Sequence, residues 1–172
     1  MVELRDSNAV FDATGTYRYT LWREWDAALP RLAFVMLNPS TATAIANDPT
    51  IRRCIGFAQA WGFGAVEVVN LFAYRSTHPQ QLRLAADPVG TENDWYVQQA
   101  AEKAEIVVLA WGNWGYLQAR DRTMYQLLAS YNPQCLGLTK TGQPRHPLYL
   151  RRDVVLRPMP NGAHSADERL EC

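Results

Sequence analysis

Cysteine, net charge and long apolar segments are all scarce in this chain of 172 residues. Its three cysteines, Cys54, Cys135 and Cys172, form neither a CxxC pair nor a Cys/His set with the spacing of a zinc site. An odd and scattered set of this kind argues against a disulfide framework and favours a reducing cytoplasm over export. We therefore predict a cytoplasmic protein with no metal site and no cofactor.

We also expect no apolar leader. Its first residues, MVELRDSNAVFD, carry charges early and have the pattern of neither a signal peptide nor a transmembrane segment, so we expect no membrane partner. Seventeen basic residues balance seventeen acidic ones. Binding to nucleic acid would therefore need a local basic patch rather than a global field. Candidates for a basic rim beside a pocket are Arg52, Arg53, Arg75 and Arg145. The alternative is that these arginines lie on ordinary solvent-exposed surfaces and bind nothing.

The composition that remains is that of a globular domain, with 48% hydrophobic and 20% charged residues. A chain of this length can bury a sizeable core. We predict a single domain over residues 1–172, with a core over about residues 17–150 and a C-terminal extension over residues 151–172. The sequence shows no internal repeat or linker, and it leaves the oligomeric state open.

The stretch from Leu32 to Gly62 organises the chain. Residues 32–37, LAFVML, contain no charge, which suits a strand buried on both faces of a parallel sheet. The loop that starts at Asn38-Pro39 ends this strand, because proline has no N–H for the ladder. Asp48-Pro49 then has the pattern of a helix N-cap followed by proline at the first helical position. Asp48 is also the nearest acidic residue in sequence that could take a proton near Asn38.

Three further apolar runs predict core strands near residues 66–70, 106–110 and 134–138. Helical patterns over residues 91–104 and 116–131 separate them, and strand–helix–strand units favour right-handed parallel crossovers.

The alternating segment over residues 16–25 predicts an antiparallel or edge strand, and residues 154–156 predict a short last strand. The predicted fold class is therefore α/β, a three-layer α/β/α domain with a central, mainly parallel four-stranded sheet and an N-terminal edge strand.

Polar loops follow the four core strands: LNPST, VVNLFAYRST, AWGNWG and RHPLYL. Because the carboxyl ends of parallel strands share one edge of a sheet, we expect Asn38, Asn70, Asn113 and His146 to be near neighbours there. The alternative is that the asparagines only terminate strands and that His146 is a surface residue. The candidate ligand-binding residues in and beside these loops are Ser40, Thr41, Asn70, Phe72, Tyr74, Arg75, Trp114, Arg52 and Arg145.

Three of these candidates are aromatic. Phe72 and Tyr74 follow Asn70 directly, and Trp114 lies in the third loop, so each is a candidate for stacking on a base. Such stacking contributes about 1 to 3 kcal/mol per base.

Longer blocks carry a resemblance to a known family. MLNPSTA, NDPTIRR, VVNLFAYRSTHP, AWG and LGLTKTGQPRHPLYL occur in this order between Tyr17 and Leu150. On these blocks the chain resembles the bacterial and phage family filed as domain of unknown function 1643. This resemblance implies a family and no activity.

A second resemblance is to the uracil-DNA glycosylase superfamily, whose motifs in chain order are GQDPYH or GINPG, LLLN, LLWG and HPSPLS. The segments LNPST, VVNL, LAWG and HPLYL are similar to these motifs, in the same order and at strand ends. The resemblance implies a uracil-DNA glycosylase-like fold and a catalytic site. In it Asn38 would position water, Asn70 would read the base and His146 would stabilise the leaving base. Ser40 stands where the NPG form of the first motif has glycine.

Two functions follow from these patterns. The first is a hydrolase of the glycosylase type that acts on a nucleobase in DNA, RNA or a free nucleotide, with Asn38, His146 and Asp48 as its catalytic candidates. The second is a non-catalytic domain that binds a nucleotide or nucleic acid in the same strand-end pocket. A domain whose function lies elsewhere is the remaining alternative.

Overall fold

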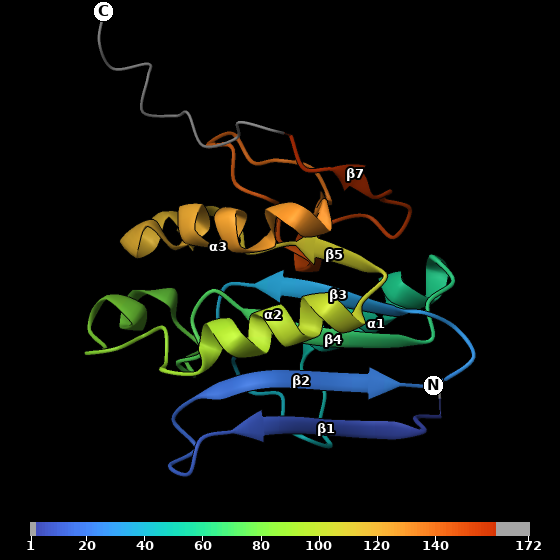
Figure 1. Ribbon diagram of the computed structural model, residues 1–172, viewed down its shortest axis with the longest axis horizontal. Coiled ribbons are helices and arrows are strands. Elements are labelled where there is room, and N and C mark those ends of the chain that lie inside the picture. Colours follow the sequence, from blue (N-terminus) through green and yellow to red (C-terminus); the bar gives the residue numbers. More distant parts are fainter. Residues whose placement is uncertain (1–2, 161–172) are drawn as a thin grey trace, which may run out of the picture.

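The computed structural model describes residues 3–160. These residues form one mixed sheet of seven strands in the order β1-β2-β4-β3-β5-β6-β7 (Figure 1). The strands are β1 (Asp6–Phe11), β2 (Arg18–Glu24), β3 (Arg31–Met36), β4 (Ala65–Asn70), β5 (Ile106–Leu109), β6 (Gln134–Cys135) and β7 (Arg157–Pro158).

The centre of the sheet is parallel and its sides are antiparallel. β4, β3, β5 and β6 run parallel to one another, whereas β1 with β2, β2 with β4, and β6 with β7 pair in the antiparallel sense. The predicted α/β class is confirmed. The sheet is larger and more mixed than the four-stranded, mainly parallel sheet that we predicted, because antiparallel strands pair at both of its edges, β1 and β2 on one side and β7 on the other. β2 is antiparallel, which is one of the two alternatives that we predicted for residues 16–25. It is not the edge strand, because β1, which we did not predict, pairs on its outer side.

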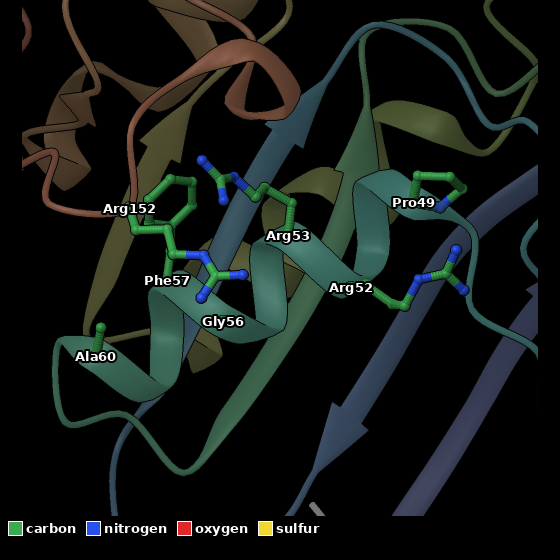
Figure 2. Close-up of a pocket in the computed structure, with 7 residues that line it drawn as sticks. All are labelled: Pro49, Arg52, Arg53, Gly56, Phe57, Ala60 and Arg152. Atoms are coloured by element: carbon green, nitrogen blue, oxygen red, sulfur yellow. The ribbon is translucent and has the colours of Figure 1, made fainter. Parts of the chain in front are cut away.

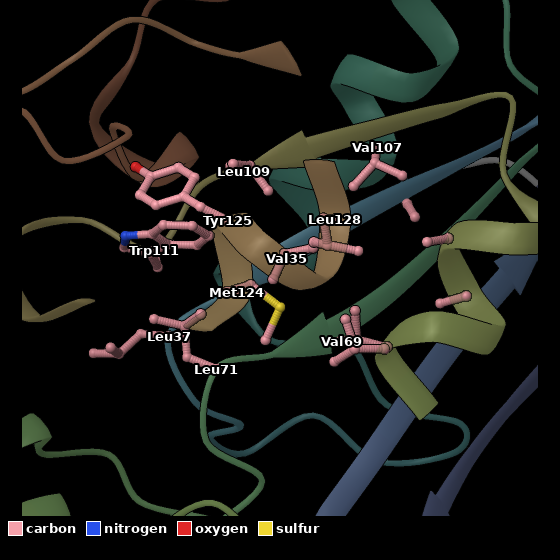
Figure 3. Close-up of a cluster of buried hydrophobic side chains, with 14 of the residues drawn as sticks. Val35, Leu37, Val69, Leu71, Val107, Leu109, Trp111, Met124, Tyr125 and Leu128 are labelled. Atoms are coloured by element: carbon pink, nitrogen blue, oxygen red, sulfur yellow. The ribbon is translucent and has the colours of Figure 1, made fainter. Parts of the chain in front are cut away.

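Helices cover both faces of the sheet. α1 (Pro49–Ala60) packs with Leu21, Phe34 and Val66 on one face. α2 (Asn93–Lys103) and α3 (Arg120–Leu128) pack on the other face. Figure 3 shows this second core, in which the α3 side chains Met124 and Leu128 lie against the strands. No helix within residues 3–160 has the length and apolar character needed to cross a membrane.

The start of α1 is fixed by its sequence, as predicted. The Asp48 side chain accepts a hydrogen bond of 2.8 Å from the Ile51 N–H, and Pro49 occupies the first helical position, where a missing N–H costs nothing. Gly62, just after the helix, has φ of +83°, a conformation that glycine adopts without steric cost. This cap sets Asp48 at the carboxyl edge of the sheet.

Several predicted boundaries were wrong. The segment over residues 116–131 is not one helix: a 3-10 segment (Asn113–Ala119) precedes α3, and Gln118 and Ala119 both have φ of +53°, which breaks the helix. β6 has two residues instead of five, and the last strand lies at Arg157–Pro158 rather than at residues 154–156. Such short strands are fixed by their neighbours in the sheet more than by their own sequence.

Candidate functional site

A cavity of about 510 Å³ opens where β3 and β4 end, beside the N-terminus of α1. The loop around His146 forms a further wall. The polar and charged residues that line the cavity are Arg18, Asn38, Ser40, Asp48, Thr50, Asn70, Ser76, Thr77, Asn113 and His146. The four residues that we expected to be near neighbours thus line one cavity.

Asn70 is the last residue of β4 and is 1% exposed. Its Nδ2 is buried without a hydrogen-bond partner, and its side-chain oxygen takes part in no hydrogen bond with the described residues. An unsatisfied buried polar group costs about 1 to 3 kcal/mol, so such groups are rare in folded proteins. The Asn70 side chain lines the cavity, and its amide carries both a donor and an acceptor.

Asn38 has a fixed orientation. Its Nδ2 donates to three backbone oxygens, those of Pro39 at 3.1 Å, Tyr74 at 3.3 Å and Ser76 at 2.9 Å. These bonds tie the loop after β3 to the loop after β4. Because the nitrogen is occupied, the side-chain oxygen is the group that Asn38 presents to the cavity, and an amide oxygen can accept a hydrogen bond from a water molecule.

His146 begins a 3-10 turn (Pro147–Tyr149) and is half-buried. Its Nδ1 accepts a hydrogen bond of 3.2 Å from the Leu148 N–H. Burial lowers the pKa of His146 below its usual value, and the nearby Asp48 carboxylate opposes this shift only in part. The imidazole is therefore neutral near pH 7. With Nδ1 as an acceptor, the ring proton lies on Nε2, which makes that nitrogen a hydrogen-bond donor.

Asp48 caps α1 through one carboxylate oxygen, and the other oxygen has no hydrogen bond within the described chain. The sequence suggested two roles, helix cap and proton acceptor. The cap is present, and it leaves the second carboxylate oxygen available to accept a proton. Among the described residues that line the cavity, Asp48 is the acidic one.

Arg18 lines the cavity, although we did not predict it as a site residue from the sequence. Its side chain is 2% exposed, its Nη1 donates to the Ala42 carbonyl at 3.0 Å, and its Nε has no partner. Burial lowers its pKa to about 10, and Asp48 opposes that shift. The β1–β2 register shifts between Val10 and Phe11, which is the kind of irregularity that redirects a side chain next to a functional site.

The three aromatic candidates, Phe72, Tyr74 and Trp114, lie in different places in the structure. Trp114 lines the cavity, as do Trp111 and the exposed Tyr149, which we had not singled out. Phe72 is 0% exposed and packs in the core beneath α2 and α3, so it presents no ring to the cavity. Tyr74 is half-buried in a neighbouring hollow that also contains Arg75.

The predicted arginine rim does not form one continuous border of the cavity. Arg52 and Arg53 line a separate groove of about 470 Å³ on the outer side of α1, together with Arg152 (Figure 2). Arg53 donates to the carbonyl oxygens of Pro147 and Leu150 and so holds the His146 loop against α1.

Two other candidates, Arg145 and Thr41, are exposed and do not line the cavity. Within residues 3–160, no group of three or more His, Cys, Asp or Glu side chains is placed to hold a metal ion.

A family model described as "Protein of unknown function (DUF1643)" matches residues 18–148. The chain belongs to the DUF1643 family. No curated protein and no solved structure matches it. The matched range of this DUF1643 protein starts at Arg18 and contains Asn38, Asp48, Asn70 and His146, so the family model spans the polar lining of the cavity.

Proposed function

We propose that this DUF1643 protein recognises a nucleobase in the strand-end cavity and hydrolyses the N-glycosidic bond that joins the base to its sugar. We also propose that its fold is a variant of the three-layer α/β/α fold of uracil-DNA glycosylases. The observation that carries the proposal is the Asn70 amide, which is buried at the end of a rigid strand and unpaired. A pyrimidine edge has the matching donor and acceptor.

The other residues of the cavity supply the groups that this reaction needs. Water attacks the anomeric carbon of the sugar, the bond from that carbon to the base nitrogen breaks, and the bonding electrons leave with the base. The Asn38 oxygen orients the water, and the free oxygen of Asp48 takes its proton. The His146 Nε2–H donates to the base as negative charge develops on it, and such aimed donors are among the larger contributions to catalysis.

The second candidate function is binding without catalysis. It is favoured by one observation: Asp48 already caps α1, which is sufficient reason for an Asp at this position. A protein of this kind would hold a nucleotide or nucleic acid in the same cavity through Asn70.

A base-release assay distinguishes the two functions. Purified protein is incubated with uracil-, hypoxanthine- and modified-base oligonucleotides and with the free nucleosides, and released base is measured by chromatography while binding is titrated separately. Release of the base by the wild type, and slower release by a His146 variant, support the hydrolase. Binding without release of the base supports the second function. Absence of both binding and release would refute the proposal.

Two variants test the residue roles. Asn70→Asp replaces a donor with a charge, and we expect an affinity loss of about tenfold or more or a change in the preferred base. His146→Ala should reduce turnover more than binding. Gln98→Glu on the exposed surface of α2 and His78→Ala in an exposed loop are matched controls that should change neither. Unchanged affinity in Asn70→Asp together with unchanged turnover in His146→Ala would reject this site.

A further inference from the structure

A second hollow, of about 420 Å³, adjoins the cavity. Ser40, Ser76 and Thr77 line both, so these three residues form a shared wall. Arg75 is the one charged residue among those that line the hollow. A molecule that fills the cavity can therefore extend past the shared wall toward a single guanidinium group.

The Arg75 guanidinium is held in place but has no counter-charge. Its Nη1 donates to the Gly15 carbonyl at 2.9 Å, and its Cζ lies 4.9 Å from the centre of the Phe11 ring. Its Nε is buried without a partner. In the described chain Arg31, Arg120 and Arg151 each pair with a carboxylate, whereas Arg75 pairs with none.

Unpaired polar atoms are concentrated at this place. Four buried side-chain nitrogen or oxygen atoms within residues 3–160 lack a partner, and three of them belong to Arg18, Asn70 and Arg75. These three residues line the cavity or the hollow. Burial is the main cause of the lowered pKa of Arg18, the Asp48 carboxylate opposes it, and the positive charge of Arg75 adds to it. A bound anion would offset the positive charge of Arg75, which has no carboxylate partner in the described chain.

The shared wall supplies further donors. The hydroxyls of Ser40 and Thr77 make no hydrogen bond with the described residues, whereas the Ser76 hydroxyl is engaged with His78 and Gln81. A phosphate has several strong acceptor oxygens, and the planar guanidinium fork matches them. Hydroxyls beside a fixed arginine are therefore a suitable set for a phosphate group.

We propose that the hollow around Arg75 is a phosphate subsite and that the ligand of this protein is a phosphorylated nucleotide, whose base enters the Asn70 cavity. This inference rests on the proposed function, because it assigns a base to the cavity. The phosphate is either the terminal group of a free nucleotide or a phosphodiester of a single strand, and both present the same anionic oxygens to Arg75.

The test compares ligands that differ only in phosphate. Affinities are measured by calorimetry for deoxyuridine, deoxyuridine 5′-monophosphate, a short uracil-containing single strand and inorganic phosphate. We expect the monophosphate to bind at least about tenfold more tightly than the nucleoside. The gain should shrink as salt is raised, because charge attraction is screened. Stronger binding of the single strand than of the monophosphate would identify the phosphodiester as the source.

Variants of Arg75 separate this inference from the proposed function. Arg75→Gln should abolish the gain from phosphate and leave the affinity for deoxyuridine unchanged, which also shows that the variant is folded. Arg75→Lys should restore part of the gain. Arg5→Gln removes the same charge from an exposed position at the opposite end of β2 and should keep the full gain.

Three results would overturn the inference. If deoxyuridine binds but phosphate adds no affinity, or if the gain survives in Arg75→Gln, the phosphate subsite is wrong and the base cavity stands. If inorganic phosphate binds through Arg75 while no nucleoside binds, the proposed function fails and the nucleotide assignment fails with it.

Discussion

Replacing Asn70 with leucine should make the protein more stable and remove its ligand binding. The two side chains have the same number of heavy atoms, so the substitution mainly exchanges an amide for two methyl groups. Asn70 is 1% exposed and its Nδ2 has no partner. Removing an unsatisfied buried polar group recovers about 1 to 3 kcal/mol of folding free energy. For a chain of this size each kcal/mol raises the melting temperature by about 2 to 4 °C.

A neighbouring asparagine is the matched control. Asn93 is equally buried. Its Nδ2 donates to the carbonyl oxygens of Asn70 at 2.9 Å and Leu71 at 3.1 Å, whereas its Oδ1 has no partner. Asn93→Leu removes two hydrogen bonds and one unpaired oxygen. Because two buried carbonyl oxygens then lose this donor, the loss outweighs the gain and the variant should be less stable than the wild type. The same chemical change is thus expected to have opposite signs at two adjacent buried sites.

Thermal and urea denaturation followed by circular dichroism measures both variants without a ligand. A destabilisation of Asn70→Leu by more than about 1 kcal/mol would refute the reasoning, because it would mean that the Asn70 amide supports the fold. Unchanged binding of the nucleobase by a stable Asn70→Leu variant would refute its role in the cavity.

Three other predictions concern stability. Gly64→Ala should strongly destabilise the protein in chemical denaturation, because the new Cβ would overlap the backbone oxygen of Asp26. Gly56→Ala in α1 should stabilise it by up to about 1 kcal/mol, since a Cβ there meets no atom within 4 Å. Equal effects of the two substitutions would contradict both expectations. Asp48→Ala should lower stability by about 0.5 to 2 kcal/mol through loss of the α1 cap, and an unchanged urea midpoint would show that the cap contributes nothing. Burial lowers the pKa of His146 below 6.5, so stability is retained above that pH and lost as pH falls below it. His146→Gln should therefore lose less stability than the wild type between about pH 7 and pH 5, and parallel curves would refute this assignment.

The central strands could be predicted because each is buried on both faces. An uninterrupted apolar run, such as residues 32–36 of β3 or the whole of β5, has an unambiguous pattern. The edges could not be predicted in the same way: β1 alternates between exposed and half-buried residues, and β7 has only two residues. Such strands are fixed by pairing with β2 and with β6 rather than by an apolar pattern of their own.

The candidate site was partly predictable for the same reason. Asn38 follows β3 and Asn70 ends β4, and parallel strands bring their carboxyl ends to one edge. Arg18 lies in an antiparallel strand whose register shifts, and no local pattern shows that its side chain enters the cavity. Phe72 follows Asn70 by two residues, yet the strand has already ended and the ring packs in the core instead.

The sequence by itself determined the α/β class, the start of α1 at the Asp48 cap and the gathering of polar residues at the strand ends. These properties depend on local pattern, on capping chemistry and on the geometry common to all parallel sheets. Only the tertiary structure decided which side chains remain without partners. Whether Asn70 is paired, or Arg75 neutralised, depends on groups brought from distant parts of the chain, because hydrogen bonds and ion pairs are satisfied in space rather than along the sequence.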